Sequence, residues 1–177
     1  MLQPSLRINR QVAGEGVTFR NNLVQCAVRG LWFILVAQTV LFPIAIADDR
    51  LSFQRRIITL QPTSGTAIMF DVETAITDAQ QRHGLMNRTT LAPMTGMIFI
   101  FEQTAHRYFW MKNTPLSLDI LFFDENGNLE KVVPEATPNK DDIIASGSAI
   151  KYVLEIGAGE AQRLKITPGT KLLLPIE

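Results

Sequence analysis

The sequence is organised around one stretch, Phe109-Trp110-Met111-Lys112-Asn113-Thr114-Pro115. An apolar run precedes it, Met97-Ile98-Phe99-Ile100-Phe101, and another follows it, Leu118-Asp119-Ile120-Leu121-Phe122-Phe123. Short apolar runs that are bounded by turn residues are typical of buried strands. The pattern therefore predicts three central strands, over residues 97–102, 107–113 and 118–124.

Three polar side chains, those of Lys112, Asn113 and Asp119, lie inside this apolar region. A buried polar group without a partner costs roughly 1 to 3 kcal/mol, so each of them needs a partner or a ligand. The short connection between strands 107–113 and 118–124 favours antiparallel pairing. We therefore expect Lys112 and Asp119 to lie close together near the closed end of a hairpin.

Weaker signals place the outer elements. Apolar residues alternate with polar ones over 68–73, which predicts a half-buried strand. Thr77 and Gln80 form a capping-box pattern, so a short helix should run to about Met86. Asn126-Gly127 is a strong hairpin signal, whereas the polar stretch 134–148 is expected to be a surface loop. About eight short strands with one helix indicate a mainly β fold, an antiparallel sandwich or barrel.

The N-terminal part has the features of an export signal. Arg29 precedes a long apolar segment, residues 30–44, and Ala45-Ile46-Ala47 fits a small-x-small cleavage site. We predict cleavage near Ala47 and a periplasmic or secreted product that meets the membrane only through this segment; an uncleaved N-terminal anchor is the alternative. The resulting organisation is an extended n-region and signal peptide (1–47), a lead-in (48–65) and a single β domain (66–177).

Composition and motifs argue against several classes of function. The chain has 17 Lys and Arg against 17 Asp and Glu, so no net positive charge favours nucleic-acid binding. Its one cysteine, Cys26, excludes an internal disulfide. The two histidines, His83 and His106, have no second ligand at metal-site spacing, and no phosphate loop or nucleophile elbow is present. No metal and no cofactor is expected.

Five segments carry a resemblance to a known family. They are Arg82 with Gly84-Leu85-Met86-Asn87-Arg88, Gly96-Met97-Ile98-Phe99, Phe109-Trp110-Met111-Lys112-Asn113-Thr114, Leu118-Asp119-Ile120-Leu121-Phe122, and Tyr152-Val153-Leu154-Glu155 with Gly159. Over about residues 66–175 the chain resembles the domain of unknown function 192 family. The resemblance implies a compact, jelly-roll-like β domain that is often exported in bacteria, and it implies no activity.

Two functions fit these observations. The first is a monomeric envelope module, without catalysis, that binds a small anionic or polar ligand or assists another envelope protein. Its candidate ligand-binding residues are Arg88, Trp110, Lys112, Asn113 and Asp119. The alternative is a hydrolase- or isomerase-like enzyme with Asp119 as acid/base and Lys112 as electrophile. Four of these candidates also have a structural interpretation: Asp119 as a buried acceptor, Lys112 in a salt bridge to Asp119 or Glu102, Asn113 as a turn residue, and Arg88 as an ion pair between the helical loop and the sheet.

Overall fold

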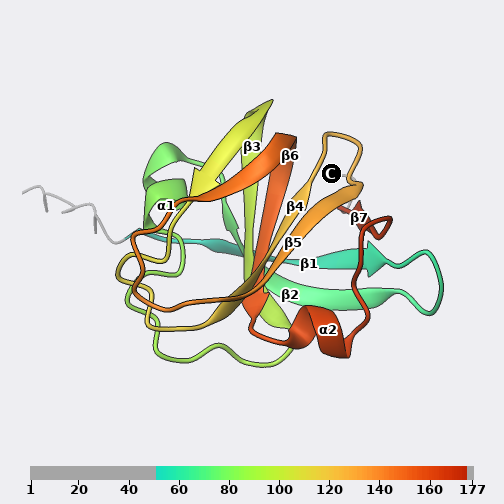
Figure 1. Cartoon of the computed structure of the whole chain (residues 1–177), viewed down its shortest axis with the longest axis horizontal. Coiled ribbons are helices and arrows are strands. Elements are labelled where there is room, and N and C mark those ends of the chain that lie inside the picture. The colour runs from blue at the N-terminus through green and yellow to red at the C-terminus, as the bar shows by residue number, and fades with distance from the viewer. Residues whose placement is uncertain (1–50, 175–177) are drawn as a thin grey trace, which may run out of the picture. The chain divides into compact units, whose positions relative to one another are not determined.

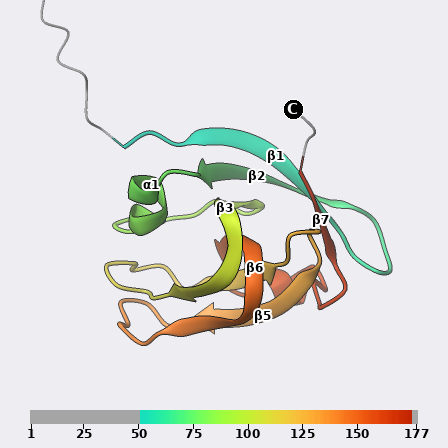
Figure 2. The ribbon, with the colours of Figure 1, turned by 90° about the horizontal axis from the view of Figure 1, so that it is seen from above.

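The computed structural model describes residues 51–174, which form one seven-stranded sheet in the order β5-β4-β6-β3-β2-β1-β7. The sheet curls into a half-barrel, and two short helices lie at its margins (Figures 1 and 2). The elements are β1 (Gln54–Gln61), β2 (Ile68–Ala75), α1 (Asp78–His83), β3 (Thr95–Phe109), β4 (Leu118–Phe123), β5 (Leu129–Ala136), β6 (Ile144–Gly157), α2 (Glu160–Arg163) and β7 (Lys171–Leu173). The predicted mainly β fold is confirmed, and β1, inside the expected lead-in, belongs to the same sheet.

The expected signal segment lies outside the described residues. Within residues 51–174, no helix has the length and apolar character needed to cross a membrane.

The centre of the sheet differs from the prediction. One strand, β3, runs through residues 103–106, which were expected to connect two strands, and its pairing with β6 shifts register there. The predicted hairpin of 107–113 with 118–124 is wrong, because β6 lies between β3 and β4 and pairs with both. Figure 1 shows β6 between its two neighbours. A short connection favours adjacent strands, but it does not prevent a later strand from entering between them.

The stretch 134–148 is also more ordered than predicted. It contains the end of β5 and the start of β6, so only residues 137–143 connect the two strands. The polar composition was misleading because β5 is an edge strand, where proline and exposed polar residues are tolerated. The Asn126-Gly127 hairpin is confirmed: it joins β4 to antiparallel β5, and Gly127 has φ 78°.

The short helix begins where it was predicted. The Thr77 hydroxyl accepts a hydrogen bond from the backbone N–H of Gln80, and the Gln80 side chain completes the capping box. The helix ends at His83, earlier than expected, because Gly84 adopts φ 50°. α1 lies in the crossover between β2 and β3, the one parallel pair among the described strands. The crossover places α1 beside β3.

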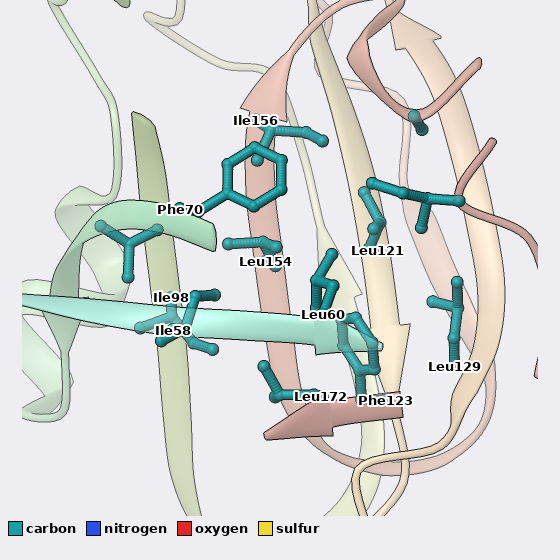
Figure 3. Close-up of a cluster of buried hydrophobic side chains, with 13 residues drawn as sticks. Ile58, Leu60, Phe70, Ile98, Leu121, Phe123, Leu129, Leu154, Ile156 and Leu172 are labelled. Atoms are coloured by element: carbon teal, nitrogen blue, oxygen red, sulfur yellow. The ribbon is translucent and has the colours of Figure 1, made fainter. Parts of the chain in front are cut away.

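Both faces of the sheet are packed. One face holds a cluster to which every strand contributes, including Phe70, Leu121 and Leu154 (Figure 3). The second cluster includes Phe99 and Phe122. Because side chains alternate along a strand, β6 supplies residues to both clusters, and residues 153–156 in its second half are all buried.

Gly96 sets the approach of β3 to β6. A Cβ atom at this position would lie 2.2 Å from the backbone oxygen of Glu155, closer than any tolerable contact. We expect Gly96→Ala to force the strands apart and to lower the free energy of unfolding by about 1 to 3 kcal/mol, as overpacking does. The control is Gly157→Ala in the same sheet, where a Cβ would meet only the Glu160 side chain at 3.9 Å. Urea denaturation measures both, and equal stabilities would contradict this interpretation.

Candidate functional site

A cavity of about 450 Å³ lies on the face of the sheet beside α1. Its helical side is formed by α1 and by the turn after it, residues 84–86. Its sheet side is formed by Phe99, Phe101 and residues 106–109 of β3, with Trp110 and Thr114. Glu155 of β6 completes the lining. The volume falls in the range of small-molecule sites in proteins.

Hydrogen bonds and close packing fix α1 against the sheet. The Gln81 side-chain amide donates to the carbonyl oxygens of Ile76 and Ile100, each at 2.9 Å. A Cβ atom on Gly84 would lie 3.2 Å from the ring of Phe99, so the turn after the helix packs directly on β3. The hydrogen bonds of Gln81 and the packing of Gly84 therefore hold the helical side of the cavity against the sheet.

Aromatic side chains form the sheet side of the cavity. The Phe109 ring meets three others edge to face, with centroid distances of 5.2 Å to Phe99, 5.8 Å to Phe122 and 6.4 Å to Phe101. Edge-to-face pairs at these separations are favourable beyond the area that they bury. Trp110, by contrast, is 52% exposed. Of these two neighbours, Phe109 therefore anchors the core and Trp110 remains open to solvent beside the cavity.

A prediction follows for these two side chains. Phe109→Ala removes a half-buried ring with three aromatic neighbours, so we expect it to cost roughly 2 to 3 kcal/mol, below the 3 to 5 of a fully buried phenylalanine. Trp110→Ala should cost less than about 1 kcal/mol, because most changes at exposed positions are small. Thermal or chemical unfolding of both variants measures this difference. A larger loss from Trp110→Ala would show that the core assignment is wrong.

Glu155 is the most unusual group in the cavity, and the sequence did not single it out. The residue is only 5% exposed, and its strand neighbours are Met97 and Ile120. Among residues 51–174, no hydrogen-bond donor or cation pairs with its carboxyl group. Burial raises the pKa of this carboxyl group to about 8, so it holds its proton at neutral pH.

The alternation that predicted β6 is the reason that Glu155 was missed. Tyr152, Leu154 and Ile156 alternate with Val153 and Glu155, and this period of two predicts a strand with the first three residues facing inward and Glu155 facing outward. Since the second core covers the opposite face of β6, Glu155 is inside as well. The available signal is a carboxylate within an apolar strand run, the same signal that makes Asp119 a candidate.

Basic side chains also line the cavity. The Arg107 guanidinium carbon lies 4.0 Å from the centroid of the Phe101 ring, and its Nη2 donates to the carbonyl oxygen of Gln103 at 2.6 Å. The Nε atom of Arg107 is buried and has no partner among the described residues. Arg82 lies 3.9 Å from Asp78 in an exposed pair. Of these two arginines in the lining, Arg107 is therefore the one with a buried donor that has no partner.

Asp119 lies away from the cavity and has a structural role. It is fully buried, and its carboxyl oxygens accept hydrogen bonds from the backbone N–H groups of Glu135 (2.8 Å), Gly159 (3.1 Å) and Ala161 (2.8 Å). The expected approach to Lys112 is not found, since Lys112 is exposed and no ion pair joins the two within the described part of the chain. Asp119, on β4, instead joins this strand to β5 and to the start of α2.

The other candidates from the sequence are dispersed. Arg88 pairs with Glu73 of β2 at 2.6 Å, which ties the loop after α1 to the sheet as its structural interpretation anticipated. Asn113 is exposed, adopts φ 54°, and its carbonyl oxygen accepts from the N–H of Asn87 at 2.8 Å, so it is a turn residue. Lys112 also lies in this turn. Only Trp110, among the predicted candidates, lines the cavity.

Metal binding has no support in this region. No group of three or more His, Cys, Asp or Glu side chains that could hold an ion occurs in residues 51–174.

The comparisons with known proteins place the chain in a family. Residues 59–174 match the model of domain of unknown function 192 (DUF192), described as "Uncharacterized ACR". The chain therefore belongs to the DUF192 family. No curated protein matches it.

Two solved structures are similar. One, from Sinorhizobium meliloti 1021, is provisionally described as a transcription regulator; it is 37% identical with a TM-score of 0.68, over 70% of this chain and 95% of that one. The other, from Novosphingobium aromaticivorans DSM 12444, is a protein of unknown function; it is 34% identical with a TM-score of 0.67, over 75% of this chain and 90% of that one.

The segments that carried the family resemblance meet at the cavity. Arg82 and residues 84–86, then Phe99, then Phe109 with Trp110 and Thr114, and finally Glu155 all line it. The segment 118–122 lies elsewhere, where Asp119 holds the fold together. The cavity is therefore the place where most of the distinctive sequence of this chain converges.

Proposed function

We propose that the domain binds a small organic ligand in the cavity between α1 and β3, without catalysis. The observation that carries the proposal is a buried, unpaired carboxyl group, that of Glu155, in a cavity with aromatic walls. A buried polar group without a partner is costly unless something else satisfies it. A bound molecule would supply the missing partner, and the aromatic side chains would cover its apolar part.

The enzymatic alternative has less support. It needs Asp119 as acid/base and Lys112 as electrophile, yet Asp119 is enclosed by three backbone donors and Lys112 is exposed in a turn. The charge balance of the whole chain likewise gives no reason to propose nucleic-acid binding, despite the description of the Sinorhizobium protein.

A fragment library tests the binding proposal on the purified full-length protein by ligand-observed NMR. Met86→Trp places a large ring at a half-buried position in the lining, whereas Met69→Trp changes an exposed residue outside the cavity. We expect compounds to bind wild type and Met69→Trp, and to lose binding in Met86→Trp. The proposal fails if no compound binds, or if every bound compound is indifferent to Met86→Trp.

We further propose that the protein acts outside the cytoplasm. The support is the sequence 29–47, with its basic residue, apolar segment and small-x-small site. Mass spectrometry of the protein from its natural host should give a mature N-terminus at Asp48. An intact N-terminus would contradict cleavage.

A further inference from the structure

We infer that the ligand is a small carboxylate with an apolar ring and a hydrogen-bond acceptor at its far end, whose anionic group meets Arg107 and whose acceptor meets Glu155. This inference rests on the proposed binding function and specifies its ligand class. It combines three observations: an aromatic wall, an unused guanidinium donor and a buried carboxyl group without a protein partner.

The aromatic wall selects an apolar body. Phe99, Phe101 and Phe109 line one side of the cavity, and Leu85 lines the other. Aromatic rings favour edge-to-face or offset contacts with another ring, which favours a planar ligand of limited size.

Arg107 selects the charged end. Its guanidinium is held over Phe101 and by the Gln103 carbonyl oxygen, yet its Nε–H remains unused. The Nε–H is shielded from solvent, so a ligand in the cavity would meet the terminal Nη groups of this guanidinium, whose planar edge of donors matches the two oxygens of a carboxylate. A single such edge suits a carboxylate better than a phosphate, which usually collects several donors.

Glu155 selects the other end. At neutral pH its carboxyl group is protonated, so it can donate a hydrogen bond to a hydroxyl or carbonyl oxygen. An ammonium group would meet the like charge of Arg107, which lines the same cavity. The remaining ionisable groups of the lining are Asp78, Arg82 and His83 on the helical side, and His106 and Tyr108 on β3. Asp78 and Arg82 offset each other, so the lining favours an anion.

Two matched probes test whether the cavity prefers an anionic or a cationic ligand. 4-Hydroxyphenylacetate and tyramine share a phenol ring and a two-carbon side chain but carry opposite charges. Titration calorimetry on the full-length protein at pH 7 should show the acid binding at least tenfold more tightly than the amine. Arg107→Gln should weaken the acid at least tenfold and change the affinity of neutral 4-hydroxyphenylacetamide less than threefold. Arg107→Lys should restore part of the loss.

The contribution of Glu155 has its own measurement. Raising the pH from 7 to 9 should weaken binding of the acid to wild type, because the ionised carboxylate no longer donates. In Glu155→Gln, whose amide still donates, the same change of pH should have a smaller effect.

The experiments distinguish failure of the proposed ligand class from failure of the proposed binding in the cavity. If tyramine binds as well as the acid or better, or if Arg107→Gln leaves the affinity of the acid unchanged, the anionic ligand class is wrong while cavity binding stands. The ligand class also fails if neither probe binds but other compounds bind in a manner sensitive to Met86→Trp. If no compound binds in a manner sensitive to Met86→Trp, both the ligand class and the binding function are wrong.

Discussion

Asp119→Ala is expected to lower the free energy of unfolding by roughly 3 to 6 kcal/mol, because it leaves three buried backbone N–H groups without an acceptor at about 1 to 3 kcal/mol each. These donors belong to Glu135 on β5 and to Gly159 and Ala161 at the start of α2. A loss of this size is a large part of the stability of an ordinary domain, so the variant should be partly unfolded at 37 °C.

The matched comparison is Asp71→Ala. Asp71 is also a strand carboxylate, but it is half-exposed and pairs with Arg55 at 2.8 Å on the surface, where such pairs contribute less than about 1 kcal/mol. Asp119→Asn should lie between the two, since the amide oxygen keeps some of the acceptor capacity while its NH₂ faces a donor. Urea denaturation ranks the variants. Similar midpoints for Asp119→Ala and Asp71→Ala would refute the role of Asp119 as an internal acceptor.

Glu155→Gln is expected to stabilise the protein progressively as the pH rises. In the unfolded chain the carboxyl group titrates near its ordinary pKa of 4.5, whereas in the folded protein burial raises the pKa to about 8. Between these values the unfolded state releases a proton that the folded state retains, so wild type loses stability as the pH rises through this window. At 1.36 kcal/mol per pKa unit, the loss reaches roughly 4 to 5 kcal/mol at and above pH 8.

The glutamine variant has no proton to lose, so its advantage over wild type should be small at pH 5 and near its maximum at pH 9. Chemical denaturation at pH 5, 7 and 9 measures the difference in the free energy of unfolding between the variant and wild type. Contributions from other titrating groups cancel in this difference. Met69→Gln, at an exposed position of β2 that carries no titrating group, should show little change with pH. A difference for Glu155→Gln that is constant across this range would contradict the buried, protonated carboxyl group.

Local signals in the sequence predicted local structure well. The capping box at Thr77 and the Asn126-Gly127 turn are satisfied by residues within a few positions of each other, and both are confirmed. The central pairings were not predictable in the same way. They depend on β6, which comes later in the chain and enters between β3 and β4, and no spacing near residues 109–118 reveals it.

The site was harder to predict than the fold for a physical reason. Lys112 and Asn113 are candidate ligand-binding residues because they interrupt an apolar run. The interruption is a turn, where polar side chains reach solvent. Asp119 is buried, as its place in an apolar run predicts, but its partners are backbone groups, which carry no sequence signal. Glu155 became visible only when both faces of β6 were known to be covered.

The position of β6 also has a consequence for biosynthesis. A ribosome produces β3 and β4 before the strand that separates them, so until residue 157 has emerged each keeps an unpaired apolar edge. Such edges are templates for association with other chains. The nascent polypeptide therefore has its longest period of risk while its last third is being made, and a chaperone that shields β3 and β4 during that interval would protect it most.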